Sequence, residues 1–214
     1  RYLTDLPPDE HAARLRFVVL LAYATGLRAS ELADARCGRL QRRAVGEAGE
    51  EMVRLRVLGK GGRIRWVPIA PAVMDALGEY LRERGLPADP AHCDPAIPLL
   101  ARLSRTVGQG ADVANCNEPL TTAAIYRIFK QPFGDISRQL ERKGLIEDAA
   151  QLARASTHWM RHTFGSHAAA DQVPLTVVQK VLGHASLATT TLYSQAEDEV
   201  VWREVGRFVA RRAS

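Results

Sequence analysis

Residues 157–193 read THWMRHTFGSHAAADQVPLTVVQKVLGHASLATTTLY, a stretch of helical character that carries several chemically active side chains. His158 and Arg161 are three residues apart, so on a helix they share one face and both can point at one anion. We interpret them as a phosphate clamp. His184 and Tyr193 follow without an acidic cluster beside them. This set of side chains suits a phosphate diester that is attacked by a phenol.

The order of these residues resembles the tyrosine recombinase family, also called phage-type integrases, whose pattern is H-x-x-R, then L-G-H, then a Tyr nine residues after that His. The family also has an Arg in an A-T-G-L-R-x-x-E-L segment and a Lys in a β-hairpin turn. Here ATGLRASEL supplies Arg28 with Glu31, and VLGKGGRIRWVPI supplies Lys60. The resemblance covers nearly the whole chain and is weakest at about residues 85–118 and 137–154. The family order is complete at Arg28, Lys60, His158, Arg161, His184 and Tyr193.

The resemblance implies a role for each of these residues. Tyr193 would attack the phosphate and form a 3′-phosphotyrosyl intermediate, which a 5′-hydroxyl reseals without ATP. Arg28 and Arg161 would stabilise the negative charge of the phosphorane by bidentate hydrogen bonds. A metal ion performs this task in other enzymes. His158 and His184 would bond the same oxygens or help to move the tyrosine proton, and the sequence does not divide these two tasks between them.

Lys60 would protonate the departing 5′ oxygen, and Glu31 would hold Arg28 by an ion pair. An ordinary surface carboxylate is the alternative for Glu31. We expect no cofactor, because the glycines around Lys60 belong to a hairpin turn and no G-x-x-x-x-G-K-[ST] loop is present. We also expect no metal. His158, His162 and His167 are the imaginable ligands, since the first two are four apart, but H-W-M-R-H lacks the Glu of H-E-x-x-H and places a cation among the ligands.

The periodicity of the chain predicts a mainly α-helical fold with a small antiparallel β-sheet (α+β), as in the catalytic core of tyrosine recombinases. Val53, Leu55 and Val57 alternate with arginines, which predicts a hairpin over about 52–69 with Lys60 at its tip. Apolar residues at helical spacing, with capping residues and glycines at the ends, predict the helices. They are expected at 9–26, from near Ser30, at 71–84, at 121–130, twice within 136–155, around His158, at 174–182 and at about 197–212.

Four arginines in the hairpin are candidate DNA contacts. If Arg56 faces Arg65 across the hairpin, then Arg54 and Arg63 fall on the same side and four like charges crowd one face. Such crowding suits a phosphate backbone. The alternatives are a register that differs by one residue, or arginines that extend into water.

Composition sets the broad class of the protein. A chain of 214 residues with 46% hydrophobic composition can bury a sizeable core, and its net charge of +5 favours a polyanionic partner. Apolar runs such as FVVLLAYA are too short to span a bilayer, and we see no leader, so we expect a cytoplasmic protein that associates with the nucleoid when it is bound to DNA. Cys37, Cys93 and Cys116 are odd in number and widely spaced, which indicates free thiols.

We expect residues 1–214 to form a single catalytic domain, without the helical DNA-clamping domain that precedes it in such enzymes. Residues 85–119 are rich in Pro, Gly, Asp and Asn, which predicts a long, partly mobile loop. The apolar stripe of the last helix, about residues 197–212, could pack against either of two surfaces. It packs either onto a neighbouring protomer in a tetramer on DNA or onto its own domain.

Together these patterns predict a site-specific recombinase that cuts and rejoins double-stranded DNA. A type IB topoisomerase is one alternative, because it shares the fold and the phosphotyrosine but swivels one strand and reseals the same ends. The other alternative is a DNA-binding regulator that keeps the fold without catalysis.

Overall fold

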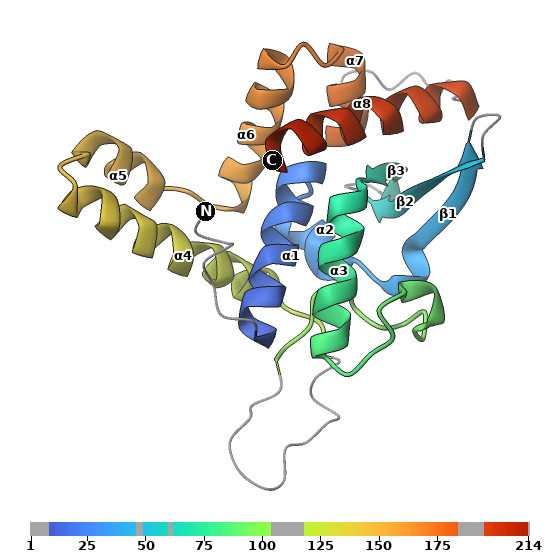
Figure 1. Cartoon of the computed structure of the whole chain (residues 1–214), viewed down its shortest axis with the longest axis horizontal. Helices are drawn as coiled ribbons and strands as arrows, with labels where there is room; N and C mark the ends of the chain where they lie inside the picture. Colours follow the sequence, from blue (N-terminus) through green and yellow to red (C-terminus); the bar gives the residue numbers. More distant parts are fainter. Residues whose placement is uncertain (1–8, 46–48, 60–61, 104–117, 184–194, 214) are drawn as a thin grey trace, which may run out of the picture.

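The computed structural model describes residues 9–45, 49–59, 62–103, 118–183 and 195–213, which form a mainly helical fold with a three-stranded antiparallel sheet (Figure 1). The predicted fold class is confirmed. Lys60, Cys116, His184 and Tyr193 lie outside the described residues. The elements are α1 (Glu10–Thr25), α2 (Ala29–Asp34), η1 (Cys37–Arg39), β1 (Leu40–Val45), β2 (Glu50–Leu58), β3 (Ile64–Ile69), α3 (Pro71–Glu83), η3 (Pro90–His92), α4 (Thr122–Arg142), α5 (Ile146–Ala153), α6 (Thr157–Ala170), α7 (Leu175–Leu182) and α8 (Gln195–Ala213).

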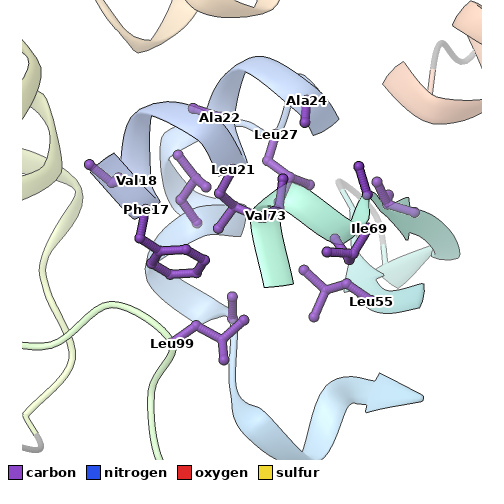
Figure 2. Close-up of a cluster of buried hydrophobic side chains, with 14 of the residues drawn as sticks. Phe17, Val18, Leu21, Ala22, Ala24, Leu27, Leu55, Ile69, Val73 and Leu99 are labelled. Atoms are coloured by element: carbon purple, nitrogen blue, oxygen red, sulfur yellow. The ribbon is translucent and has the colours of Figure 1, made fainter. Parts of the chain in front are cut away.

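Helix α1 lies at the centre of the core. Asp9 caps its first turn by accepting a hydrogen bond from the backbone N–H of Ala12 at 2.8 Å, and Gly26 ends it in the left-handed conformation. Its Phe17 and Leu21 are buried among apolar side chains from the sheet and from α3 (Figure 2). Burying a side chain of this size contributes about 1.5–3 kcal/mol, so this cluster fixes the end of α1 relative to the sheet. The cluster also includes Leu27, Leu55, Ile69, Val73 and Leu99.

The sheet has the order β1-β2-β3, and its register corrects one prediction. The hairpin between β2 and β3 is present, but Arg65 pairs with Val57 and Arg56 pairs with Trp66. Five residues, 59–63, connect the paired Leu58 and Ile64, so the register differs by one residue from the expected one. A shift of one residue moves a side chain to the other face of the sheet. The four arginines therefore do not share a face. Strand β1 was not predicted.

Part of the expected loop at 85–119 is packed against the core. Leu99 and Leu100 are buried. The hydroxyl of Tyr80 in α3 donates to the carbonyl of Ala101 at 3.2 Å, and the N–H of Ala101 lies 3.3 Å from the same hydroxyl. Residues 104–117 lie outside the described residues, so the expected mobility remains a prediction for that part.

Helix α4 is longer than predicted and joins two of the expected helices. It continues through Pro132, which has no backbone N–H to donate within the helix. Phe129 on one side of this proline is buried, and Ser137 on the other side is buried and donates to the carbonyl of Ala149 in α5 at 2.9 Å. Packing on both sides thus keeps the helix continuous. Helices α4 and α5 extend away from the sheet (Figure 1).

The apolar stripe of α8 is buried against the rest of this chain, which is one of the two partners that the sequence left open; packing onto a neighbouring protomer remains a prediction. Its C-terminal end is fixed to the turn after α6, because Arg212 donates two hydrogen bonds to Asp171 at 3.0 and 2.7 Å. None of the described helices is long and apolar enough to cross a membrane. The buried residues of the stripe are Val201, Val205, Phe208 and Val209.

Candidate active site

Arg161 lies between the C-terminal ends of two helices. It is 7% exposed, and its Nη1 donates to the carbonyl of Gly26 at 2.7 Å, while Nη2 donates to the carbonyl of Leu182. Gly26 ends α1 and Leu182 is the last residue of α7. Carbonyls at helix C-termini have no partner within the helix and carry partial negative charge, so they are suited to hold a buried guanidinium.

Gly26 of the ATGLR segment allows this contact between helices. Its φ is 58°, and a Cβ at this position would lie 2.4 Å from Cδ2 of Leu182. A side chain at position 26 would therefore displace the end of the Leu182 side chain, beside the carbonyl that binds Arg161. The left-handed backbone conformation is the stronger reason for a glycine at this position.

Arg28 is the N-cap residue of α2, which begins at Ala29, close to the start expected near Ser30. Its backbone N–H donates to Oε2 of Glu31 at 2.9 Å, and its Nη1 lies 3.2 Å from Oε1 of the same carboxylate. The expected ion pair between Arg28 and Glu31 is thus present. The side chain of Arg28 remains 45% exposed, whereas that of Glu31 is 3% exposed. The guanidinium of Arg28 is therefore accessible from solvent, while its partner is buried.

Arg65 makes the shorter and bidentate contact with Glu31. Its Nη1 and Nη2 donate to the two carboxylate oxygens at 2.8 and 2.9 Å, and its Nε donates to the carbonyl of Val181 at 3.2 Å. Burial alone would raise the pKa of Glu31, but the hydrogen bonds from Arg65 and from the backbone of Arg28 outweigh it and lower the pKa. Glu31 is therefore ionised. The sequence did not predict this inward role for Arg65.

Arg28, Arg65 and Arg161 with Glu31 form what we call the arginine cluster. Burial and then the charge of Arg28 lower the pKa of Arg161 to about 10, with a smaller contribution of the same sign from Arg65 and an opposing one from Glu31. Three cations thus lie near one carboxylate, which is paired with two of them, Arg28 and Arg65. An anion bound between Arg28 and Arg161 would relieve this repulsion.

His158 lies on the exposed side of α6, in contrast to the buried Arg161. Its Nε2 is 2.9 Å from Nε2 of His162, which is also exposed, and one ring donates to the other. The two members of the predicted phosphate clamp therefore differ in exposure, and Arg161 points inward. Within the described ranges, no group of three or more His, Cys, Asp or Glu side chains is placed to hold a metal ion.

Lys60, His184 and Tyr193 lie outside the described residues, but the residues directly before two of them border the cluster. A Cβ on Gly59 would lie 3.4 Å from Nη1 of Arg65, and a Cβ on Gly183 would lie 2.9 Å from its Cδ and Nε. The structure thus brings Arg28 and Arg161 together, and it places the chain that leads into Lys60 and His184 beside them.

Comparison with known proteins agrees with this geometry. The model of the phage integrase family matches residues 2–199. The chain belongs to the phage integrase family. The tyrosine recombinase XerC of Mesorhizobium japonicum is 33% identical over 189 residues, which cover 86% of this chain and 47% of that protein. The tyrosine recombinase XerA of Pyrococcus furiosus is 31% identical over 190 residues, covering 89% of this chain and 52% of that protein. This chain spans about half the length of these relatives.

Solved structures share the fold of this phage integrase family member at low identity. The pre-cleavage complex of the XerH site-specific recombinase with its difH substrate has a TM-score of 0.55 and 20% identity, covering 99% of this chain and 48% of that one. The integrase from mycobacterium phage Brujita has a TM-score of 0.57 and 18% identity, covering 100% of this chain and 60% of that one.

The four hairpin arginines of this integrase-family chain fall into two groups. Arg56 and Arg63 are exposed. Arg54 instead lies with its guanidinium 4.1 Å from the centre of the Trp66 ring and donates to Asp198 of α8 at 3.2 Å. Like Arg65, it forms an ion pair with a carboxylate of this chain. The first group is therefore better placed to contact a partner.

Proposed function

We propose that this protein is a site-specific DNA recombinase that cleaves and rejoins double-stranded DNA through a 3′-phosphotyrosyl intermediate at Tyr193. The arginine cluster is the observation that carries this proposal. It contains three guanidiniums and one carboxylate, and Arg28 is half-exposed, so the cluster has positive charge available for a phosphate. The relatives that carry the name tyrosine recombinase support the same chemistry.

In the proposed reaction, the Tyr193 oxygen forms a bond to phosphorus while the bond from phosphorus to the 5′ oxygen breaks. Arg28 and Arg161 hold the non-bridging oxygens and stabilise the charge of the phosphorane. His158 or His184 accepts the phenolic proton, and Lys60 donates a proton to the departing 5′ oxygen. A 5′-hydroxyl then attacks the phosphotyrosine in the reverse sense, which reseals the strand without ATP because the bond energy is conserved.

The proposed complex contains duplex DNA, and Arg56 and Arg63 would contact its phosphate backbone because both are exposed on the hairpin. A DNA substrate of this kind would place the protein in the cytoplasm with the nucleoid. A tetramer on DNA remains part of the proposal. Assembly through residues 197–212 would require α8 to leave its own domain, and this would break the bidentate contact between Arg212 and Asp171.

Covalent capture tests the proposal. The protein is incubated in EDTA with a pool of nicked duplexes of randomised sequence, so that cleavage releases a short strand and traps the adduct. Mass spectrometry of the denatured adduct should locate the nucleotide on Tyr193. Tyr193→Phe should bind the pool and form no adduct, and Tyr126→Phe, a change at an exposed tyrosine of α4, should form it normally.

Three outcomes would argue against this function. An adduct on another residue would remove the proposed nucleophile, and cleavage that needs a divalent cation would remove the proposed chemistry. Relaxation of supercoiled DNA without recombinant products would instead assign the protein to strand swivelling, as in type IB topoisomerases. The captured sequences would also show whether the reaction is specific for a site.

A further inference from the structure

Arg65 connects three parts of the candidate active site without being one of its predicted catalytic residues. We propose that Arg65 is a positioning residue: by neutralising Glu31, it leaves the guanidinium of Arg28 directed outward, toward the scissile phosphate. This inference rests on the proposed function and adds a specific role to it. It also replaces the direct DNA contact that the sequence suggested for Arg65.

The two arginines share the carboxylate of Glu31 unequally. Arg65 donates to both oxygens at 2.8 and 2.9 Å, and its side chain is only 15% exposed. The guanidinium of Arg28 reaches one of these oxygens at 3.2 Å and remains 45% exposed. Arg65 therefore supplies most of the neutralisation, and the Arg28 side chain keeps N–H donors on the solvent side for a substrate.

Two glycines leave room for the Arg65 side chain in this position. A Cβ on Gly183 would lie 2.9 Å from Cδ and Nε of Arg65 and 3.2 Å from Cζ, so the guanidinium passes directly over the backbone at the end of α7. A Cβ on Gly59 would lie 3.4 Å from Nη1. The Nε group also donates to the carbonyl of Val181 at 3.2 Å. The side chain is thus enclosed by the hairpin, α7 and Glu31.

Loss of the bidentate contact from Arg65 to Glu31 would change the position of Arg28. Glu31 is buried, and an unpaired buried carboxylate is unfavourable, so it would attract the nearest cation. Arg28 is already in contact with it and would be drawn inward, away from the substrate side. A lysine at position 65 would not prevent this change, because an ammonium is a single point charge that does not match both carboxylate oxygens in one plane.

The first test compares Arg65→Lys with wild type in single-turnover covalent capture on a nicked duplex. The rate of adduct formation should fall by about a hundredfold, the usual effect of a displaced catalytic group, while affinity for DNA changes little. Arg39→Lys is the matched control. Arg39 also donates from both Nη atoms to one carboxylate, that of Asp34, but it lies in η1, outside the site. Its cleavage rate should equal that of wild type.

A second pair of variants tests whether Arg65 acts through Glu31. Arg65→Gln leaves Glu31 to attract Arg28, whereas the double variant Glu31→Gln/Arg65→Gln removes that attraction. The double variant should therefore cleave faster than Arg65→Gln alone, although it carries one more change. Additive losses would overturn the proposal, because they would show that the two residues act independently. This comparison remains valid if Arg65→Lys does not fold.

A substrate with sulfur as the bridging 5′ atom separates this role from that of Lys60. A thiolate leaves without a proton, so Lys60→Ala should regain cleavage on this substrate, while Arg65→Lys should remain slow because Arg28 is still displaced. Equal recovery of both variants would overturn the proposal and assign Arg65 to the leaving-group side. If wild-type protein forms no adduct on any substrate, the proposed function fails instead, which is a distinct result.

Discussion

Replacing Glu31 with glutamine would test the electrostatic design of the arginine cluster. Glutamine has nearly the same shape and still offers one oxygen to the backbone N–H of Arg28, but its NH2 group would face Nη1 of Arg65, so the change removes the charge and one of the two acceptors. Neutralising one partner of a buried ion pair costs about 3–5 kcal/mol. Arg65 and Arg28 keep 15% and 45% of their side-chain surface, so solvent offsets part of this loss. We therefore expect a loss of about 3 kcal/mol.

Urea unfolding followed by circular dichroism at neutral pH measures this loss, and thermal unfolding should show a melting temperature lower by about 6–12 °C, since 1 kcal/mol corresponds to about 2–4 °C in a chain of this size. The difference should also depend on pH. The pKa of Glu31 is lowered in the folded protein, so its contribution is complete above the ordinary carboxyl pKa of about 4.3 and is lost as pH falls through the lower folded value.

The control is Glu79→Gln, because Glu79 pairs with Arg16 while keeping 42% of its side-chain surface. An exposed pair of this kind contributes about 0–1 kcal/mol, so the control should unfold almost as wild type does. If Glu31→Gln is as stable as the control at neutral pH, the carboxylate does not neutralise the cluster. A difference from wild type that persists unchanged at the lowest pH would show that packing, and not charge, causes the loss.

Three further variants test other parts of the site and fold. Gly183→Ala should lose about 1–2 kcal/mol in urea unfolding, because its φ is 63°, and it should also slow covalent capture by displacing Arg65. Arg161→Lys should slow capture by about a hundredfold or more, because an ammonium does not replace the bidentate donors, and near-normal capture would remove Arg161 from the chemistry. Phe208→Ala should lower the free energy of unfolding by about 3–5 kcal/mol, since this α8 side chain is fully buried, and an unchanged urea midpoint would show that α8 does not stabilise its own domain.

Much of the fold follows from local patterns in the sequence. Alternation of apolar and charged residues predicted the hairpin, Gly26 predicted the end of α1, and Pro71 predicted the start of α3. These signals act within a few residues, where backbone preferences are strong. The pairing of Arg28 with Glu31 is equally local, because the two residues are three apart at the start of one helix.

The parts of the site that were not predicted depend on contacts between distant segments. Arg65 turns inward because the hairpin connection has five residues, and one residue fewer would have reversed its face. The spacing of His158 and Arg161 shows that they lie on one side of a helix. It does not show that Arg161 reaches carbonyls of residues 26 and 182, which the packing of α1 and of α7 against α6 brings together.

The hydrogen-bond partners of Arg161 explain how this buried guanidinium is stabilised beside two other cations without losing its net positive charge. A guanidinium needs acceptors for its N–H groups when it is buried, and a second carboxylate would satisfy them but cancel its charge. The carbonyls of Gly26 and Leu182 accept the hydrogen bonds and carry only partial charge. One N–H group on each Nη atom is thus satisfied, while the positive charge and the other donors of the guanidinium remain. In the proposed reaction, a bonded carboxylate would compete with the phosphate for Arg161, and these carbonyls would not.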